Sequence, residues 1–426
     1  MYKIIKNIFV VSILAAVSAA SVFAQSLSAD ERKIAAAVDA DSAAQIALLE
    51  RTVNIESPTE NLEGVRAVGM IFKKELEALG FAARWIEMPK EMKRAGHLIA
   101  ERRGGKGKRL LLLGHLDTVL RGEKFRREGD LAYGTGISDM KAGNAVLLSA
   151  LKALGAADAL KDANITVLLT GDEENSGEPV STSRGDMIEA AGRSDLVLSF
   201  ENGGNGVATV ARRGIGDWML EVTGKTGHSS QIFKESMGAG AIFEASRIIN
   251  QFYEALGKEK YLTFNPSLFV GGTEAASADF SGNATGKTNV VAARAVVRGD
   301  LRFISKEQEQ SARGKMREIV GKSLPGTSAK ITFFDGIPAM APTDANYEIL
   351  KKLDVVSRDL GFGEIKPLDP GERGAGDISY VTHLIPGLDG LGAIGTKAHA
   401  PGEYIELGAL PQQTKRAALL IYRLTR

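Results

Sequence analysis

Three short apolar segments that each run into ionisable residues constrain the fold most strongly. They are RLLLLG (109–114) before His115, NITVLLTG (164–171) before Asp172, Glu173 and Glu174, and DLVLSF (195–200) before Glu201. Apolar residues at helical spacing over 140–154 separate the first two. This alternation is typical of a mainly parallel sheet covered by helices. Because ligands of such sheets bind at the carboxyl ends of the strands, we expect the ionisable residues to gather there.

The pattern changes after Arg213. It predicts strands and helices in the order β-α-β-β-α-β, the split arrangement of ferredoxin-like domains, over 216–223, 237–256, 262–270, 289–303, 305–322 and 329–334. A chain of 426 residues is too long for one ordinary core. We therefore predict an α/β catalytic domain made of 25–212 and 335–426, interrupted by an α+β lid domain, 213–334. Helices near 347–360 and 411–424 complete the first domain.

The N-terminus reads as an export signal. Lys3 and Lys6 precede an apolar stretch, 8–17, and small residues surround a cleavage point after Ala24. We expect a signal peptide over 1–24 and a periplasmic or secreted protein. The alternative is an uncleaved anchor, but the apolar run is shorter than the roughly 20 residues that a spanning helix needs.

The net charge limits the kinds of binding partner that we expect, and the absence of cysteine limits the possible metal ligands. The net charge of +1 offers no basic surface for nucleic acid or an anionic membrane, so we expect a small-molecule or peptide partner, and no membrane association once the signal is removed. The chain has no cysteine, so it has no disulfides. Any metal ion must be bound by histidine and carboxylate.

Two short motifs carry candidate metal ligands. In His115-Leu116-Asp117, residues two apart in an extended segment point the same way, so Asp117 can orient the His115 ring from behind. An ordinary pair of residues at a strand end is the alternative. Asp139 lies in the glycine-rich loop 133–143, immediately before a helix. It is either the helix N-cap or a carboxylate that bridges two cations.

Glu173 and Glu174 are adjacent acids at the end of an apolar strand. Their negative charges repel each other unless a cation or a proton lies between them. The alternative is that both glutamates belong to a solvent-exposed turn. If a metal is present, one glutamate can bind it while the other faces the substrate as a base. Glu201 adds a carboxylate, and His399, in the segment 392–402, adds an imidazole.

Two imidazoles and three carboxylates suit a pair of zinc ions. In this interpretation Asp139 is shared by both ions. The other ligands are His115 and Glu201 for one ion, and Glu174 and His399 for the second. Spacing alone does not establish this pairing.

Six segments, in this order and spacing, resemble the aminoacylase and glutamate carboxypeptidase family of co-catalytic zinc metallopeptidases, most closely its glutamate carboxypeptidase branch. They are GHLDTV, YGTGISDMKAG, LLTGDEENSG, LSFENG, TGKTGHSS and KAHAPGEYI. The resemblance runs from about Gln45 to the C-terminus. It implies two Zn²⁺ per subunit, Glu173 as catalytic base, a lid matching the insertion, and a cis peptide bond between Asp139 and Met140.

The resemblance also implies roles for lid residues. His228 would stabilise the oxyanion, often in the site of a partner subunit, which implies a homodimer formed through the lid. The alternative is a buried histidine at a strand end. Asn289 and Arg302 resemble substrate-binding residues, with Arg302 suited to a terminal carboxylate and Arg298 a competitor for that role. Gly376 resembles part of a substrate-facing glycine turn. His97 and His383 are interpreted as structural.

The sequence thus predicts an exported zinc hydrolase of amide bonds next to a free carboxylate, with a small peptide or N-acyl amino acid as substrate. A carboxypeptidase acting on C-terminal glutamate is one candidate, and an aminoacylase or a dipeptidase is the nearest alternative. An inactive binding protein is a further alternative, although every metal ligand and the base are present. A serine hydrolase built on Ser176 or Ser229 lacks a nucleophile-elbow sequence.

Overall fold

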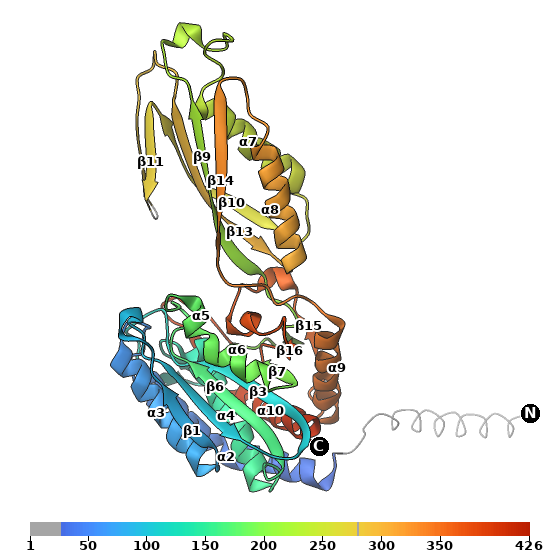
Figure 1. The fold of residues 1–426 in the computed structure, drawn as a ribbon. Helices are drawn as coiled ribbons and strands as arrows, with labels where there is room; N and C mark the ends of the chain where they lie inside the picture. Colours follow the sequence, from blue (N-terminus) through green and yellow to red (C-terminus); the bar gives the residue numbers. More distant parts are fainter. Residues whose placement is uncertain (1–26, 279–280) are drawn as a thin grey trace, which may run out of the picture.

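The computed structural model describes residues 27–278 and 281–426, so the predicted signal peptide, 1–24, lies outside the described residues. The chain forms two units (Figure 1). The main unit surrounds a six-stranded sheet. The inserted unit, Gly214–Asp335, is an elongated sheet with helices on one side. Among the described residues, none of the helices combines the length and the apolar character needed to cross a bilayer.

The central sheet of the main unit has the strand order β1-β2-β6-β3-β7-β16. Four neighbouring strands, β6, β3, β7 and β16, run parallel, whereas β2 is antiparallel to both β1 and β6. The expectation of a mainly parallel sheet is confirmed. The bounds are β1 Ala82–Ile86, β2 His97–Arg102, β3 Lys106–His115, β6 Ala163–Thr170, β7 Leu196–Ser199 and β16 Gly387–Leu388.

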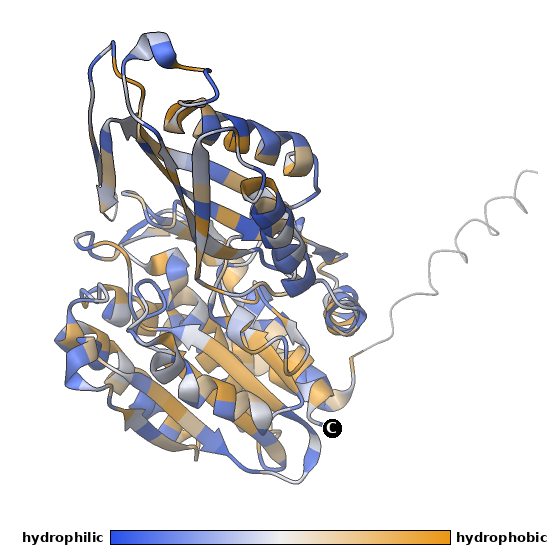
Figure 2. Cartoon of the chain, turned by 45° about the horizontal axis from the view of Figure 1, so that its top comes forward, coloured by the Kyte–Doolittle hydropathy of each residue, from blue (hydrophilic) through white to orange (hydrophobic). Residues whose placement is uncertain are grey.

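Helices cover both faces of this sheet, which explains why its strands are continuously apolar. Successive side chains of β3 enter different cores: Leu110 and Leu112 belong to the larger cluster, Leu111 and Leu113 to the smaller one. In Figure 2 the central strands are correspondingly hydrophobic. The helices of the unit are α2 Ala29–Val53, α3 Leu62–Ala78, α4 Ala142–Ala156, α5 Val180–Ser183, α6 Gly185–Gly192, α9 Asp344–Asp359 and α10 Leu410–Leu424.

The inserted unit has the strand order β10-β13-β9-β14, all antiparallel, with its own hydrophobic core. This is the predicted ferredoxin-like arrangement. One face of the sheet packs on two helices through buried residues that include Trp218 and Phe252. The elements are β9 Gly214–Gly224, α7 Ala241–Leu256, β10 Thr263–Gly272, β13 Arg294–Phe303, α8 Lys306–Val320 and β14 Thr327–Asp335.

Two predicted boundaries in this unit are wrong. The helix begins at Ala241 rather than 237, because Gly238 and Gly240 adopt φ values of +81° and +78°, outside the helical region. The third strand begins at Arg294 rather than 289. A hairpin of β11 Glu274–Ala278 and β12 Ser281–Thr285 was not predicted.

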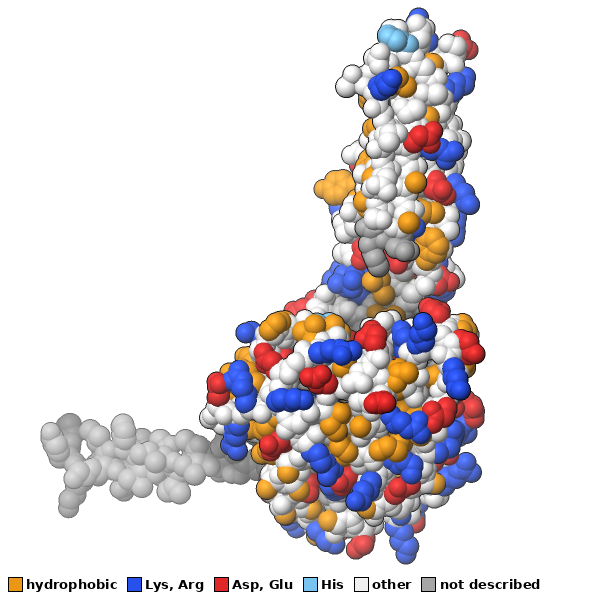
Figure 3. Space-filling model, turned by 90° about the vertical axis from the view of Figure 1, so that its left-hand side faces the viewer, with side chains coloured by type: hydrophobic (Ala, Val, Ile, Leu, Met, Phe, Trp, Pro, Cys, Tyr) orange, Lys and Arg blue, Asp and Glu red, His pale blue; other side chains and the backbone are white. Residues whose placement is uncertain are grey.

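Surface charge is mixed on the face of the molecule shown in Figure 3, where basic and acidic side chains alternate over the main unit. No single sign dominates that face, in keeping with the net charge of +1.

Candidate metal centre

The ends of three neighbouring parallel strands bring the first candidate ligands together. His115 is the last residue of β3, while Glu173 and Glu174 follow β6, and Glu201 follows β7. Since β6, β3 and β7 are adjacent and parallel, these residues leave the same edge of the sheet. The expected gathering of ionisable residues at this edge is what the structure shows.

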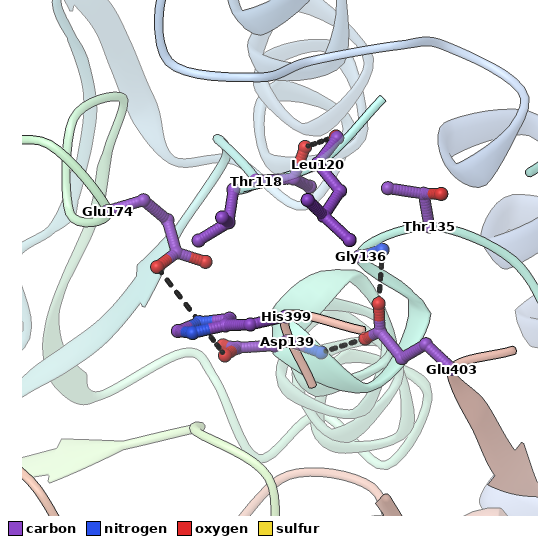
Figure 4. Close-up of a pocket in the computed structure, with 9 residues that line it drawn as sticks. Thr118, Leu120, Thr135, Gly136, Asp139, Glu174, His399 and Glu403 are labelled. Atoms are coloured by element: carbon purple, nitrogen blue, oxygen red, sulfur yellow. Dashed lines mark hydrogen bonds and ion pairs between the residues drawn. The ribbon is translucent and has the colours of Figure 1, made fainter. Parts of the chain in front are cut away.

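A small second sheet delivers Asp139 and His399 to this edge. Its strand order is β17-β18-β5-β4, with bounds β17 Gly395–Thr396, β18 Tyr404–Glu406, β5 Leu131–Tyr133 and β4 Arg126–Glu128. Asp139 follows β5, and His399 lies between β17 and β18. Because β5 pairs with β18, the two loops lie side by side, and Figure 4 shows Glu174, His399 and Asp139 converging.

Asp139 lies between the two histidines, with one carboxylate oxygen facing each. Its Oδ1 is 3.1 Å from Nε2 of His115, and its Oδ2 is 3.1 Å from Nε2 of His399. His399 Nε2 is also 3.1 Å from Oε2 of Glu174, and His115 Nε2 is 3.7 Å from Oε1 of Glu201. The geometry is that of a carboxylate shared between two sites. The peptide bond between Asp139 and Met140 is cis, as predicted.

The electrostatics of the cluster suit divalent cations. Burial alone would lower the pKa of His115. Hydrogen bonds to Asp117 and Asp139, together with the charges of nearby acids, nevertheless raise this pKa well above its usual value. Hydrogen bonds to Asp139 and Glu174 raise the pKa of His399 to about 10. Burial, and then the Asp139 charge, raise the pKa of Glu201 to about 7. The two histidines and Glu201 thus retain protons that a cation would displace.

The residues fit a pair of metal ions. Potential ligand atoms of His115, Asp139 and Glu201 lie within 4.8 Å of one another, and so do those of Asp139, Glu174 and His399. Oε1 of Glu174 is buried and has no hydrogen-bond partner among the described residues. An unsatisfied buried carboxylate oxygen is unfavourable unless a cation or proton binds it.

Asp117 orients the His115 ring and the two glutamates that follow β6, although the His115 ring is nearer to the Asp117 backbone carbonyl than to the expected carboxylate. The His115 ring Nδ1 lies 3.1 Å from the backbone carbonyl of Asp117 and 3.5 Å from its carboxylate Oδ1. The carboxylate accepts hydrogen bonds from the backbone N–H groups of Glu173 and Glu174, each at 3.1 Å, and from the Thr59 hydroxyl at 2.7 Å. Asp117 therefore fixes the backbone of both glutamates and the His115 ring.

Glu403 holds the loop that carries Asp139, and the sequence interpretation did not single it out. Its carboxylate accepts hydrogen bonds from the backbone N–H groups of Gly136 at 2.7 Å and Asp139 at 2.9 Å (Figure 4). It also accepts one from the backbone N–H of Ser138 at 2.7 Å. Glu403 follows His399 in the same loop. It therefore links the positions of Asp139 and His399.

Replacing Glu403 by glutamine is expected to weaken metal binding by about 10- to 100-fold, the usual effect of losing an outer partner of metal ligands. The amide NH₂ would face backbone N–H donors where an oxygen now accepts. Metal affinity is measured by competition with a chromogenic chelator. Glu406→Gln, on the exposed side of β18, is the matched control and should bind metal as the unmodified protein does. Equal affinities in both variants would contradict the role of Glu403.

Two buried arginine clusters behind the site were also missed. Arg184 lies between Asp172 and Asp377, at 2.6 and 2.7 Å, and Asp377 accepts a hydrogen bond from the Thr170 hydroxyl at 2.5 Å. Arg212 pairs with Asp389 at 2.6 Å. These partners are distant in sequence and form no local motif.

The Arg212 side chain also fixes the glycine turn that contains Gly376. It donates to the backbone carbonyls of Gly374, at 2.8 Å, and Ala375, at 2.6 Å. A Cβ on Gly376 would lie 2.6 Å from the Arg212 guanidinium carbon, so any side chain here would displace the guanidinium from its partners. His97, interpreted as structural, is buried and bonded to the Ser183 carbonyl and the Gly171 N–H.

The lid residues fall at opposite ends of the inserted unit. His228 is exposed and follows the end of β9 that is remote from the main unit, so the alternative of a buried histidine is wrong. The 11-residue strand β9 spans roughly 35 Å. Asn289 is next to His228, since its carbonyl accepts a hydrogen bond from Ser229. Within one chain the structure does not bring His228 or Asn289 to the cluster.

Arg302 lies at the other end of the sheet, near the main unit. It pairs across β13 and β9 with Ile215, and its Nη1 lies 3.9 Å from where a Cβ on Gly374 would be. Its Nε donates to Asp300 at 3.0 Å. Arg298 instead bonds to Ser277 of the hairpin, at 3.0 Å. Arg302 is therefore the arginine that faces the glycine turn.

The fold and the cluster together define a metallohydrolase of the α/β class. Residues 111–423 match the profile of Peptidase family M20/M25/M40. The chain is 31% identical over 396 residues to carboxypeptidase G2 of Pseudomonas sp. (strain RS-16), covering 89% of this chain and 88% of that protein. The chain therefore belongs to the M20/M25/M40 peptidase family.

Solved structures show the same fold. Aminopeptidase PepT from Bacillus cereus ATCC 10987 superimposes with a TM-score of 0.72 at 18% identity, covering 90% of this chain and 99% of that one. A Bacillus subtilis protein described as a dinuclear metal-binding peptidase of the M20 family gives 0.64 at 15% identity, covering 91% and 99%.

Proposed function

We propose that this protein is an exported zinc-dependent hydrolase that cleaves an amide bond next to a free carboxylate, in the manner of a carboxypeptidase. The observation that carries the proposal is the shared position of Asp139 between His115 and His399, with Glu173 close by. The similarity to carboxypeptidase G2 supports the carboxypeptidase assignment. Export rests on the sequence of residues 1–24.

The residues that would hold the ions follow from the geometry. One ion would be bound by His115, Asp139 and Glu201, and the other by Asp139, Glu174 and His399. Zinc is proposed because histidine and carboxylate are its ligands where cysteine is absent. When bound, such ions make water more acidic and polarise a carbonyl group.

The side chains of the chain supply the proton transfers and the binding. Glu173 takes a proton from the attacking water and later delivers it to the leaving amine. Burial, together with Glu201, Asp377 and Glu174, raises the pKa of Glu173 well above its usual value, so it holds a proton readily. Asp117 keeps the backbone of Glu173 in place.

Substrate binding involves the inserted unit, 213–334 in the predicted division, as a lid. Arg302 binds the free carboxylate beside the glycine turn that contains Gly376. Because His228 and Asn289 lie at the remote end of the lid, we propose that they enter the site of a partner subunit in a homodimer formed through the lid. There His228 stabilises the oxyanion.

The test is hydrolysis of a panel of N-acylated amino acids and dipeptides by the protein loaded with zinc, with and without a chelator. We expect hydrolysis of substrates with a free carboxylate, loss of activity with the chelator, and recovery when zinc is restored. Matched substrates that differ only in the acyl group separate an aminoacylase or dipeptidase from a carboxypeptidase. Binding of these compounds without any hydrolysis would overturn the proposal in favour of a binding protein.

A further inference from the structure

Asp300 and Arg302 form an ion pair within one strand, on the face of the inserted sheet that has no helices. Residues two apart in a strand point to the same side, and Leu301 between them belongs to the core beneath the helices. Nε of Arg302 donates a hydrogen bond to Oδ2 of Asp300 at 3.0 Å. The side chains of Arg302 and Asp300 are 35% and 28% exposed, so the pair itself adds little to stability.

This contact leaves a defined part of the Arg302 guanidinium available. Among the described residues, Nη1 and Nη2 have no hydrogen-bond or ion-pair partner. Nη1 lies 3.9 Å from where a Cβ on Gly374 would be, so this end of the group faces the glycine turn of the main unit. Two N–H groups that point the same way can bind both oxygens of a carboxylate. Because Asp300 occupies Nε, the pair that remains is Nη1 and Nη2.

The position of Asp300 is unfavourable for the sheet. Asp300 lies directly opposite Asp217 of β9. Like charges at opposed positions of neighbouring strands destabilise a sheet. The other cross-strand neighbour of Asp300 is Asn265 of β10, which has no charge to offset the repulsion. An acid that pairing across the sheet disfavours, but that contacts Arg302, indicates a role in orienting that arginine.

The backbone of Asp300 is fixed from the core of the inserted unit. The indole Nε1 of Trp218 donates a hydrogen bond to the Asp300 carbonyl at 2.9 Å, and Trp218 is 1% exposed. The preceding residue, Gly299, packs so closely that a Cβ there would lie 2.6 Å from the Trp218 ring. A buried ring thus holds the backbone from which the Asp300 carboxylate reaches Arg302.

We propose that Asp300 is a positioning residue, which holds the guanidinium of Arg302 so that Nη1 and Nη2 face the free carboxylate of the substrate. Asp300 itself does not touch the substrate. Without Asp300, the long side chain of Arg302 would become ordered only when the substrate binds, and the substrate would bind less tightly. The inference rests on the proposed function, which assigns the substrate carboxylate to Arg302.

A purely structural role of Asp300 would affect every substrate alike, whereas a positioning role affects only substrates that carry the carboxylate. The quantity that separates the two roles is the carboxylate preference. We define it as kcat/KM for an N-acyl amino acid divided by kcat/KM for the matched N-acyl amino acid amide. The two compounds have nearly the same shape, because a carboxamide replaces the carboxylate.

The experiment measures the carboxylate preference in the zinc-loaded protein and in its variants. Asp300→Ala should lower the preference by about 10-fold, mainly through a higher KM for the carboxylate compound, as expected for weakening hydrogen bonds to a charged group. Asp300→Asn keeps an oxygen that accepts from Nε of Arg302 and should retain most of the preference. Asp217→Ala is the matched control, since Asp217 lies opposite Asp300 without an ion pair to Arg302. It should leave the preference unchanged.

A double-mutant cycle tests whether Asp300 acts through Arg302. Arg302→Met should remove the preference, and adding Asp300→Ala to it should change nothing further. An unchanged preference in Asp300→Ala would overturn the role of Asp300, and so would equal losses of kcat/KM from Asp300→Ala with and without Arg302. If Asp300→Ala does not fold, Asp300→Thr, with a residue suited to strands, takes its place in the cycle.

Calorimetric binding of the same two compounds gives a readout that needs no hydrolysis. We expect the same order of preferences among the variants. If the unmodified protein binds the carboxylate compound selectively without hydrolysing it, the proposed function is overturned alone, and the cycle in binding affinities still decides the role of Asp300. A preference that survives in Arg302→Met would overturn the assignment of the carboxylate to Arg302 and this inference with it.

Discussion

Replacing Glu173 by alanine is expected to lower kcat by at least about 10²- to 10⁴-fold, the contribution typical of a positioned general base. The metal content should stay nearly intact, because the two ligand sets that share Asp139 do not include Glu173. One further grouping, of His115, Glu173 and Glu174, does place Glu173 within ligand distance. The roles of Glu173 as base and Glu174 as metal ligand therefore have to be distinguished by experiment.

The metal content after dialysis, measured by elemental analysis, and kcat together separate the two roles. Glu174→Ala should lose metal and activity together, whereas Glu173→Ala should lose only activity. Glu189→Ala, an exposed glutamate of α6, is the control and should change neither. Loss of metal from Glu173→Ala would show that Glu173 is a ligand and would remove it as the base.

Replacing Arg184 by methionine is expected to destabilise the main unit by about 3–5 kcal/mol, the cost of breaking a buried ion pair from one side. The side chain of Arg184 is 1% exposed and contacts two aspartates, of which Asp172 is 0% and Asp377 8% exposed. Without Arg184, both carboxylates stay buried without a cation. Asp377 also lies close enough to Glu173 to influence its charge, so activity should fall as well.

The chain suits this measurement because it has two tryptophans, Trp85 in the main unit and Trp218 in the inserted unit. In a Trp218→Phe background, fluorescence during denaturant unfolding reports the main unit alone. Arg193→Met is the control: Arg193 is 41% exposed and pairs with Glu101 at 3.0 Å, so its loss should cost about 1 kcal/mol or less. An equal loss of unfolding free energy in Arg184→Met and Arg193→Met would show that the buried ion pairs of Arg184 contribute no more to stability than a surface pair.

The sequence was sufficient for the ends of the strands and the residues that follow them. The strands that precede His115, Glu174 and Glu201 could be predicted because a buried strand of a parallel sheet is an apolar run, and the polar residues at its carboxyl end follow directly in the same short segment. Asp139 and His399 were singled out from glycine-rich segments, and the resemblance to the family supported their pairing with the other ligands. The small sheet that brings them side by side consists of very short strands, which have no clear pattern of their own.

Other parts of the site could not be predicted, because they depend on contacts between distant segments. No pattern in the sequence marks Arg184, Arg212, Arg373 or Glu403, and only the fold shows how far each is buried and with what partner. The choice of Arg302 over Arg298 also needed the structure. The hairpin that contacts Arg298 was not anticipated.

The pairing of β5 with β18 has a consequence for the biosynthesis of this protein. Asp139 emerges early from the ribosome, but His399 and Glu403 emerge only after the whole inserted unit has been made. A nascent chain can thus contain every strand of its central sheet except β16 while the ligand set is still open on one side. The two ligand sets can therefore be complete only after the chain has been made beyond the inserted unit, as far as His399 and Glu403.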